Sequence, residues 1–288
     1  MGWKPLKAGF AISLKLKISI FAAMFRAAIF SFILVVAVSC STLDIHPYDC
    51  DIKGERDINA RNIAKIEEYT NAKKEFTFAF ISDTQRWYDE TEDVVKSINA
   101  KGVNFVIHGG DLTDFGATYE FLWQRDILDG LQMPWVALIG NHDCLGSGEQ
   151  AFEAVFGKLN FHFTAGNVLF VCLNTNALEY DYNTPVPDFS YISHLLENLP
   201  EYVTKTVFVM HARPYADGFN NNVAEVFDYA SRRFPNVQFY LFGHEHKRME
   251  KDLFNTGLIY YGVPNIEKRQ YYLITRKEKG YECEIVDF

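Results

Sequence analysis

Residues 76–85 read FTFAFISDTQ, a short apolar run rich in β-forming residues that stops at a polar loop carrying Asp83. Residues 103–111 read VNFVIHGGD and residues 135–143 read WVALIGNHD, so the same order of apolar run and polar loop returns twice. A strand that is almost continuously apolar is expected to be covered on both faces. These three segments therefore predict buried strands.

Helical spacing of apolar residues appears between these strands. Val94, Val95 and Ile98 lie on one face of a predicted helix that stops at Gly102, and a second helical pattern ends at Gly130. A β-α-β-α-β order predicts a largely parallel sheet, in which ligand groups collect beyond the carboxyl ends of the strands. The polar block after each of the three strands falls at such an end.

The second half of the chain is richer in predicted hairpins. A turn at Gly166 and Asn167 separates strand-like residues 161–163 from the apolar run 168–173. Helix and strand patterns then alternate: a helix over 189–199, a strand over 206–210, a helix over 223–232, a strand over 237–242 and a set of strands between 253 and 286. We expect a second, mixed sheet packed on the first.

Length and charge limit the classes of function. The chain has 288 residues, 48% of them hydrophobic, which is enough for one sizeable core. Its formal charge is −9, and removal of the first 39 residues, which carry five basic side chains and no acidic one, would leave −14. An acidic body argues against a nucleic-acid-binding surface, which needs clustered Lys and Arg. It does not argue against a small phosphorylated substrate, because bound cations invert the local field.

The N-terminus predicts a targeting segment. Residues 27–39 form an uncharged apolar run with the length of a secretory hydrophobic region. Residues 37–40, AVSC, are similar to a bacterial lipoprotein cleavage box, which predicts a signal peptide over 1–39 and lipid attachment at Cys40. The expected location is the bacterial cell envelope, on a membrane anchor, facing the periplasm or the cell surface. An ordinary cleaved signal and a single membrane anchor are the alternatives, and Met24 is a candidate start site.

The segment after the leader is polar and charged. Residues 40–74 predict a tether with a short amphipathic helix near residues 58–66, and the folded domain is predicted over residues 75–288. Export permits disulfides, and four further cysteines leave the pairing open. These are Cys50, Cys144, Cys172 and Cys283.

Five short blocks place metal-binding residue types directly after apolar runs. Their candidate ligands are Asp83, Asp111, Asn141, His211, His244 and His246. Oxygen and imidazole ligands from several strand ends can hold two divalent cations side by side, and such a pair activates water and clamps a phosphoryl group. Asp111 is the candidate bridge between the cations, because Gly109 and Gly110 allow a tight turn with close backbone approach.

These blocks resemble those of the calcineurin-like metallophosphoesterase superfamily, over about residues 76–266. The resemblance implies a four-layer αββα sandwich of two mixed β-sheets, with the dinuclear metal site at the C-terminal edge of the strands. It also implies individual roles. Asp83 and His246 would bind the first metal, Asp111 would bridge, Asn141, His211 and His244 would bind the second metal, and His142 would be the general acid, with its ring oriented by Asp143.

One position departs from the family pattern. The first block usually reads Asp-x-His, and here Gln85 stands in place of the His. A Gln carbonyl oxygen still ligates but is a harder ligand than imidazole. We therefore expect two divalent ions, Mn, Fe or Zn, with Mn favoured. Arg213 is a candidate contact for a substrate phosphate, through its bidentate fork.

These features predict a metal-dependent phosphoric-ester hydrolase, a phosphomonoesterase or a phosphodiesterase. A hydroxide held between the two metals would attack phosphorus in line. The alternative is an envelope lipoprotein that keeps the fold but binds without efficient turnover, because of Gln85. The sequence leaves substrate identity and oligomeric state open.

Overall fold

The computed structural model describes residues 19–32, 49–50, 52, 54–180 and 184–288. The chain divides into two compact units, residues 1–46 and 47–288. In the first unit, residues 19–32 form a helix. Among the described residues, no helix is both long and apolar enough to cross a membrane. The predicted lipidation site Cys40 and most of the predicted signal segment lie outside the described residues.

The first sheet of the larger unit has the strand order β11-β10-β1-β2-β3. Its strands are β1 (Phe76–Ile81), β2 (Phe105–His108), β3 (Trp135–Ala137), β10 (Gln270–Arg276) and β11 (Tyr281–Asp287). The pairs β1–β2 and β2–β3 are parallel, while β10 runs antiparallel to both β1 and β11. The parallel arrangement predicted from the β-α-β-α-β opening is confirmed.

The second sheet has the order β4-β5-β6-β7-β9-β8. Its strands are β4 (Phe161–Ala165), β5 (Val168–Leu173), β6 (Lys205–Met210), β7 (Val237–Phe242), β8 (Met249–Lys251) and β9 (Tyr260–Gly262). The predicted hairpin is confirmed, since β4 and β5 pair antiparallel across Gly166 and Asn167. From β5 to β9 the neighbouring strands are parallel, so their carboxyl ends lie at one edge.

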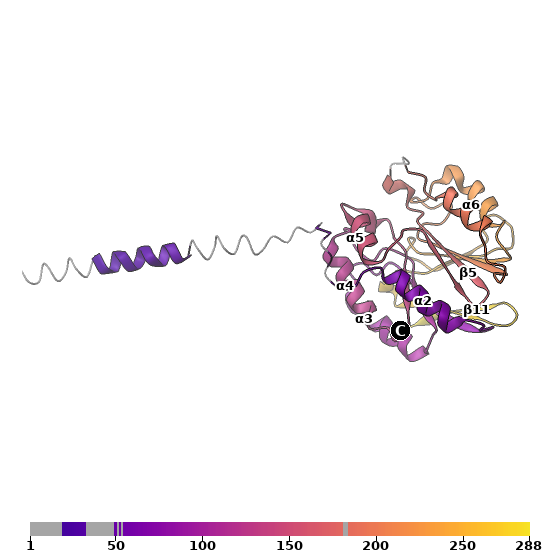
Figure 1. Ribbon diagram of the computed structural model, residues 1–288, viewed down its shortest axis with the longest axis horizontal. Coiled ribbons are helices and arrows are strands. Elements are labelled where there is room, and N and C mark those ends of the chain that lie inside the picture. Colours follow the sequence, from indigo (N-terminus) through magenta and orange to yellow (C-terminus); the bar gives the residue numbers. More distant parts are fainter. Residues whose placement is uncertain (1–18, 33–48, 51, 53, 181–183) are drawn as a thin grey trace, which may run out of the picture. The chain divides into compact units, whose positions relative to one another are not determined.

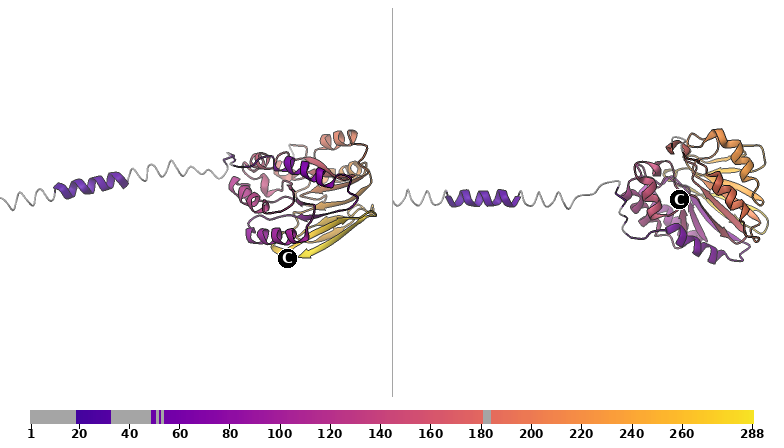
Figure 2. Two further views of the ribbon diagram at one scale, coloured as in Figure 1. Left: turned by 60° about the horizontal axis from the view of Figure 1, so that its bottom comes forward. Right: turned by 45° about the horizontal axis from the view of Figure 1, so that its top comes forward.

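Helices cover the outer face of each sheet, as Figures 1 and 2 show. Three helices pack on the first sheet and two on the second: α3 (Tyr88–Lys101), α4 (Thr118–Leu128) and α5 (Gly148–Val155), then α6 (Phe189–Glu197) and α7 (Ala224–Ser231). Short 3-10 turns lie in the connections: η1 (His142–Cys144), η2 (Ala177–Tyr180), η3 (Asn221–Val223) and η4 (Ile266–Lys268). The predicted four-layer αββα sandwich of two mixed sheets is confirmed.

The two-residue period of the strands explains the layers. Along β1, Phe78 and Phe80 point into the cluster between the sheets, while Ala79 and Ile81 point to the helices. The ring of Phe78 meets Phe170 of the facing sheet edge-on, with centroids 5.3 Å apart. Full burial of one such side chain stabilises the fold by about 1.5–3 kcal/mol. The apolar β1 run therefore holds the two sheets together and fixes where its polar end emerges.

The structure departs from the predicted tether over residues 40–74, because the larger unit begins at residue 47. Helix α2 (Ile58–Thr70) belongs to this unit and contacts β3 and β4. The side chain of Asn59 pairs with both backbone groups of Ala137, donating to O at 2.8 Å and accepting from N at 2.9 Å. Since β3 is an edge strand, α2 supplies the partners that a further strand would have provided.

Asn59→Ala should destabilise the protein by about 2–4 kcal/mol, because it leaves a buried N–H and a buried C=O of Ala137 without partners. Urea unfolding followed by circular dichroism measures the difference. Glu68→Ala, on an exposed face of the same helix, should stay within about 0.5 kcal/mol of wild type. Equal unfolding midpoints for Asn59→Ala and wild type would show that α2 does not complete the sheet.

The sequence left the pairing of the four cysteines open. Cys144, Cys172 and Cys283 carry free thiols. Cys172 lies fully buried on β5, as expected of a plain core residue, and its burial raises the pKa of the thiol well above the ordinary value. The fold therefore does not depend on cross-links among these three residues.

Candidate metal centre

The candidate ligands all follow the carboxyl ends of parallel strands. Asp83 and Asp111 follow β1 and β2, and Asn141 follows β3 on the same sheet. His211 directly follows β6, and the pair His244 and His246 follows β7 on the second sheet. Because both sheets present these ends at one edge of the sandwich, the side chains converge there. The resulting site contains ligands from both sheets.

Four ligand groups converge on one subsite. The Oδ1 atom of Asn141 lies 3.1 Å from Nε2 of His211 and 2.9 Å from Nδ1 of His244. The Oδ2 atom of Asp111 lies 3.4 Å from the same Nε2. A carboxylate, an amide oxygen and two imidazole nitrogens thus face one point, which is a ligand set suited to a divalent first-row cation.

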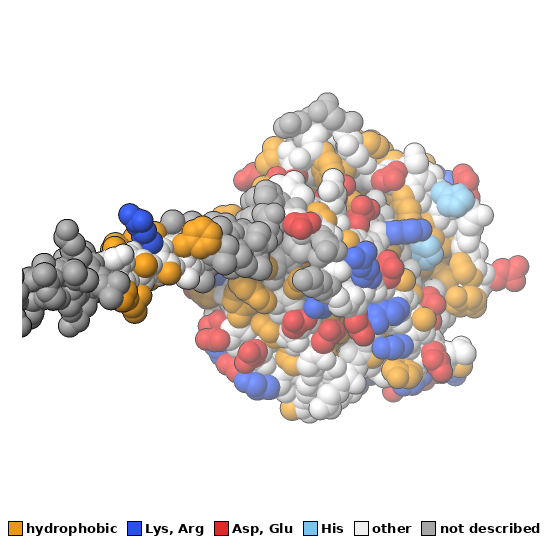
Figure 3. Space-filling model, turned by 60° about the vertical axis from the view of Figure 1, so that its left-hand side comes forward, with side chains coloured by type: hydrophobic (Ala, Val, Ile, Leu, Met, Phe, Trp, Pro, Cys, Tyr) orange, Lys and Arg blue, Asp and Glu red, His pale blue; other side chains and the backbone are white. Residues whose placement is uncertain are grey.

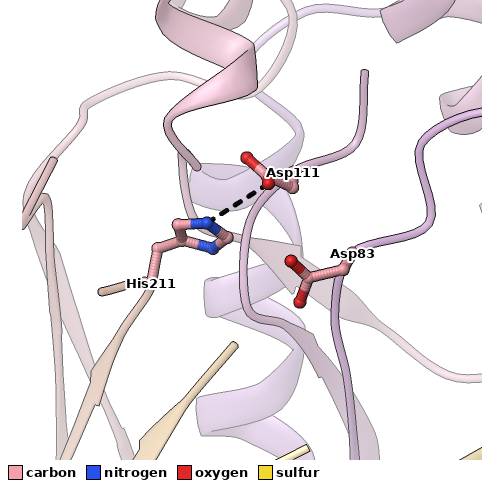
Figure 4. A group of neighbouring side chains, drawn as sticks. All are labelled: Asp83, Asp111 and His211. Atoms are coloured by element: carbon pink, nitrogen blue, oxygen red, sulfur yellow. Dashed lines mark ion pairs between the residues drawn. The ribbon is translucent and has the colours of Figure 1, made fainter. Parts of the chain in front are cut away.

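A second subsite adjoins the first. Nε2 of His246 lies 3.3 Å from Oδ1 of Asp83. Ligand atoms of Asp83, Asp111 and His211 all lie within 4.8 Å of one another, and Figure 4 shows these three side chains pointing toward a common space. Asp111 therefore adjoins both subsites, and bridging by its carboxylate stays a prediction.

Backbone contacts set the direction of each ligand. Nδ1 of His211 lies 2.9 Å from the carbonyl oxygen of Gly109, which can only accept, so Nδ1 carries a proton and Nε2 is the ring nitrogen turned to the site. Oδ1 of Asp111 accepts a hydrogen bond from the His142 amide at 2.9 Å, which leaves Oδ2 turned to the subsites. The amide of His244 donates to both oxygens of Asp83 at 3.1 Å.

The ligand loops hold left-handed backbone conformations. Among the described residues, eleven other than glycine have a positive φ, and five of them are predicted ligands: Asp83, Gln85, Asp111, His244 and His246. A left-handed conformation costs a residue with a Cβ roughly 1–2 kcal/mol. Such strain persists where the surrounding fold imposes it, and it gathers at functional sites. Here it turns each side chain inward at the end of its strand.

Two glycines leave the space that the ligands occupy. A Cβ on Gly140 would lie 2.1 Å from Oδ1 of Asp111, and one on Gly243 would lie 2.6 Å from Oδ2 of Asp83. Both distances are shorter than real contacts allow, so any larger residue would push a carboxylate out of position. The glycines that precede Asn141 and His244 are therefore part of the ligand geometry.

The site concentrates buried charge. Asp83 and His211 are fully buried and Asp111 is 1% exposed. Burial alone would raise the pKa of Asp83, but hydrogen bonding to His246 and the nearby His211 lower it below its ordinary value. Burial likewise opposes protonation of His211, yet Asp111 raises its pKa to about 9. Buried carboxylates beside imidazoles are the groups that divalent cations stabilise, so the donor set fits a metal pair.

Gln85 lies in the same loop as Asp83 and is 5% exposed. Its backbone N–H donates to the backbone carbonyl of Asp111 at 3.2 Å, and its backbone carbonyl accepts from Nε2 of Gln124 at 2.6 Å. These contacts tie the first and second ligand loops together and place Gln85 beside the proposed bridge. Ligation by its side-chain oxygen stays a prediction.

The structure corrects the role predicted for Asp143. Its carboxylate accepts from the amides of Gly140, Leu112 and Thr113, so it braces two ligand loops. Burial, together with the charge of Asp111, raises the pKa of Asp143 to about 7. The ring of His142 contacts a different residue. The donors to the Asp143 carboxylate are these amides and the Thr113 hydroxyl, and the hydrogen bond of the His142 ring goes to Asp114 instead.

Asp114 is the partner of His142 that sequence reasoning missed. Nδ1 of His142 lies 2.8 Å from the carbonyl oxygen of Asp114. The guanidinium of Arg86 holds the Asp114 carboxylate, with Nε and Nη2 at 3.1 and 2.6 Å from Oδ1. The only sequence signal for Asp114 was its place three residues after Asp111 in the same loop.

Arg213 lies beside the site but is already paired. It forms an ion pair with Glu245, which also pairs with Lys247 at 2.9 Å. The Arg213 side chain is only 12% exposed and lies over the ring of Phe242. A substrate phosphate would have to compete with Glu245 for this guanidinium, so phosphate contact by Arg213 stays a prediction.

A family model of the calcineurin-like phosphoesterases matches residues 76–248, which contain every one of the ligands above. The chain belongs to this family. The match begins at β1 and runs past the last ligand block, so the ligand loops described here are those of a calcineurin-like phosphoesterase.

Curated relatives cover parts of the chain. Over 221 residues the chain is 26% identical to YvnB of Bacillus subtilis, and the alignment covers 66% of this chain and 17% of YvnB. It is 25% identical over 171 residues to a 3',5'-cyclic-nucleotide phosphodiesterase of Nostoc sp., covering 57% of this chain and 62% of that protein. The chain thus spans less than two thirds of the length of either relative.

Among solved structures, the fold is similar to that of a dimetal phosphatase from Danio rerio. The TM-score is 0.56 at 14% sequence identity, and the alignment covers 72% of this chain and 98% of that one. Identity this low shows a shared fold.

Proposed function

We propose that this calcineurin-like phosphoesterase hydrolyses phosphoric esters of small molecules with two divalent cations, of which Mn is the favoured species and Fe or Zn the alternatives. The observation that carries the proposal is the convergence of two adjoining ligand subsets on Asp111. Asp83 and His246, with Gln85, would hold one cation. The other would be held by Asn141, His211 and His244, with Asp111 shared.

When bound, the cations supply a nucleophilic water at neutral pH and stabilise charge on the phosphoryl oxygens. The chain's own residues position the reacting groups and protonate the departing oxygen. His142 donates a hydrogen bond from Nδ1 to the Asp114 carbonyl. Nε2 is therefore the ring nitrogen that delivers a proton to the departing oxygen. Arg86 fixes the Asp114 loop and thereby the angle of the ring. Asp143 keeps the Asn141 loop against the Asp111 loop.

A substrate panel tests the proposal. Purified protein supplied in turn with Mn²⁺, Fe²⁺, Zn²⁺ and Mg²⁺ is assayed on p-nitrophenyl phosphate, bis-p-nitrophenyl phosphate and a 3',5'-cyclic nucleotide. We expect turnover that requires added metal, and the ratio of monoester to diester rates assigns the ester class. One bound metal or none, without turnover on any ester, would support the alternative of a binding protein, for which Gln85 is the sole residue-level argument.

His142→Asn should lower kcat by about 10²–10⁴-fold, because the departing oxygen loses its proton donor. The metal content should stay at the wild-type value, since the His142 ring is not among the ligand groups. Steady-state kinetics and plasma emission spectrometry measure the two quantities. His162→Ala changes an exposed histidine that contacts Tyr191, and it should leave kcat unchanged. A wild-type kcat in His142→Asn would remove this residue from the mechanism.

We further propose that the protein is a lipoprotein of a bacterial cell envelope, anchored through Cys40. The AVSC motif at residues 37–40 supports this. In a bacterial host, Cys40→Ser should abolish incorporation of labelled palmitate and move the protein from the membrane fraction to the soluble fraction. Palmitate incorporation in Cys40→Ser equal to wild type would argue against this anchor.

The surface charge is mixed on the face shown in Figure 3, where Lys and Arg side chains are interspersed with Asp and Glu. A phosphoester carries its own negative charge and would be attracted by the cations rather than by such a surface. We therefore place substrate recognition in the residues around the metal centre.

A further inference from the structure

A pocket of about 310 Å³ adjoins the metal centre on the side of His244. It is lined by Tyr215, Ala216, Asp217, His244 and Glu245. Since His244 contributes a ligand nitrogen to the second subsite, an ester held at the cations has this pocket as its neighbour. Its volume lies in the range of small-molecule sites.

Tyr215 forms the aromatic wall of this pocket, in an unusual conformation. Its φ is +66°, and the residue is 46% exposed. Left-handed backbone at a bulky residue is strained and persists only where neighbouring contacts impose it. An exposed ring on strained backbone contributes little to the core, so its position calls for another explanation.

Three contacts immobilise Tyr215. Its amide donates to Oδ1 of Asn221 at 2.7 Å, and its hydroxyl donates to Glu225 at 2.5 Å. Its ring packs on Phe254 with centroids 5.3 Å apart. A ring fixed before binding loses little entropy when a ligand lies against it. Tyr215 is therefore a preformed surface for a flat group.

The loop that contains Tyr215 also lies against the ring of His244. Gly218 lies beside this imidazole, and an added Cβ would make an ordinary van der Waals contact with its Cε1 atom at 3.5 Å. Within the pocket, Glu245 is paired with Arg213 and Lys247, while the carboxylate of Asp217 is exposed. The pocket thus combines one aromatic face with one solvent-facing hydrogen-bond acceptor.

We propose that this pocket binds the organic group of the phosphoester, with Tyr215 against a nucleoside and Asp217 accepting hydrogen bonds from its hydroxyl or amino groups. A nucleoside has both required features, since it carries flat faces that stack on aromatic rings and several hydrogen-bond donors. This inference rests on the proposed phosphoesterase function and names its substrate class as nucleotide esters.

Two diesters with one leaving group test the inference. The p-nitrophenyl ester of thymidine 5'-phosphate carries a nucleoside where methyl p-nitrophenyl phosphate carries a methyl group. Wild type should prefer the nucleoside ester, and Tyr215→Ala should reduce this preference about 10-fold, mainly through KM. Tyr215→Phe keeps the ring and should keep most of the preference. Tyr229→Ala, an exposed tyrosine on α7, should leave the preference unchanged.

Direct binding separates failure of this inference from failure of the proposed function. Isothermal titration with thymidine 5'-phosphate, on metal-loaded protein, should give a Kd about 10-fold weaker for Tyr215→Ala than for wild type at equal metal content. That difference supports the pocket even if no ester is turned over, whereas absent turnover alone counts against the proposed function. Equal Kd values for the two proteins, or a weaker Kd explained by lost metal, would overturn the pocket assignment.

Discussion

Asp111→Asn should lower kcat/KM for an aryl phosphate ester by at least about 1000-fold, since loss of roughly 4 kcal/mol of metal-derived transition-state stabilisation has that effect. Asn preserves the shape of the side chain and can still accept the hydrogen bond from the His142 amide. It removes the negative charge that lies between the two subsites, next to His211. Metal content should fall together with activity, because two like cations then lack their shared carboxylate.

The matched control for this variant is Asp126→Asn. Asp126 lies on α4, is 64% exposed and pairs with Arg125, so the same chemical change there leaves the ligand set intact. Steady-state kinetics and metal analysis on both variants and wild type decide the outcome. Asp111→Asn with two metals per chain and more than about a tenth of wild-type activity would exclude a bridging role.

Removal of divalent cations should reduce activity below about 1% of the loaded enzyme, because water is a poor nucleophile at neutral pH without them. It should also lower the thermal midpoint, since a ligand present at about 100 times its Kd stabilises the folded state by about 2.7 kcal/mol. The cations would offset the charge of the buried carboxylates Asp83 and Asp111, so this change in thermal midpoint needs no substrate.

The measurement uses dialysis against a chelator, followed by return of one metal at a time. Activity and midpoint should rise together on addition of Mn²⁺, and the midpoint supplies a readout that does not depend on the choice of ester. In Asp111→Asn, added metal should shift the midpoint less than in wild type. Full activity in protein shown by emission spectrometry to be free of metal would falsify the hypothesis that hydrolysis depends on metal.

Much of this site was predictable, because its information is local. Asp83, Asp111 and His211 each follow an apolar strand directly, and the parallel order of the strands brings such ends to one edge. The almost continuous apolar character of these runs likewise predicted strands covered on both faces. Patterns of this kind depend on neighbouring residues in the chain, so a single sequence carries them.

Other contacts were invisible to the same reasoning. Asp114 and Asp143 are both aspartates in ligand loops, and composition cannot decide which of them contacts His142. Asn59 reads as a polar residue of a solvated helix, yet it pairs with Ala137, 78 positions away. Tyr215 likewise has no local pattern, since its position follows from Asn221, Glu225 and Phe254.

The sequence by itself therefore determined the buried parallel strands and the side chains that follow them at one edge, because both depend on apolar runs and on where each strand ends. The four-layer sandwich was implied by the family resemblance. The tertiary structure decided which groups brace, orient and surround those ligands. Such partners come from loops of different strands, and their choice depends on distances of a few ångströms between segments far apart in the chain.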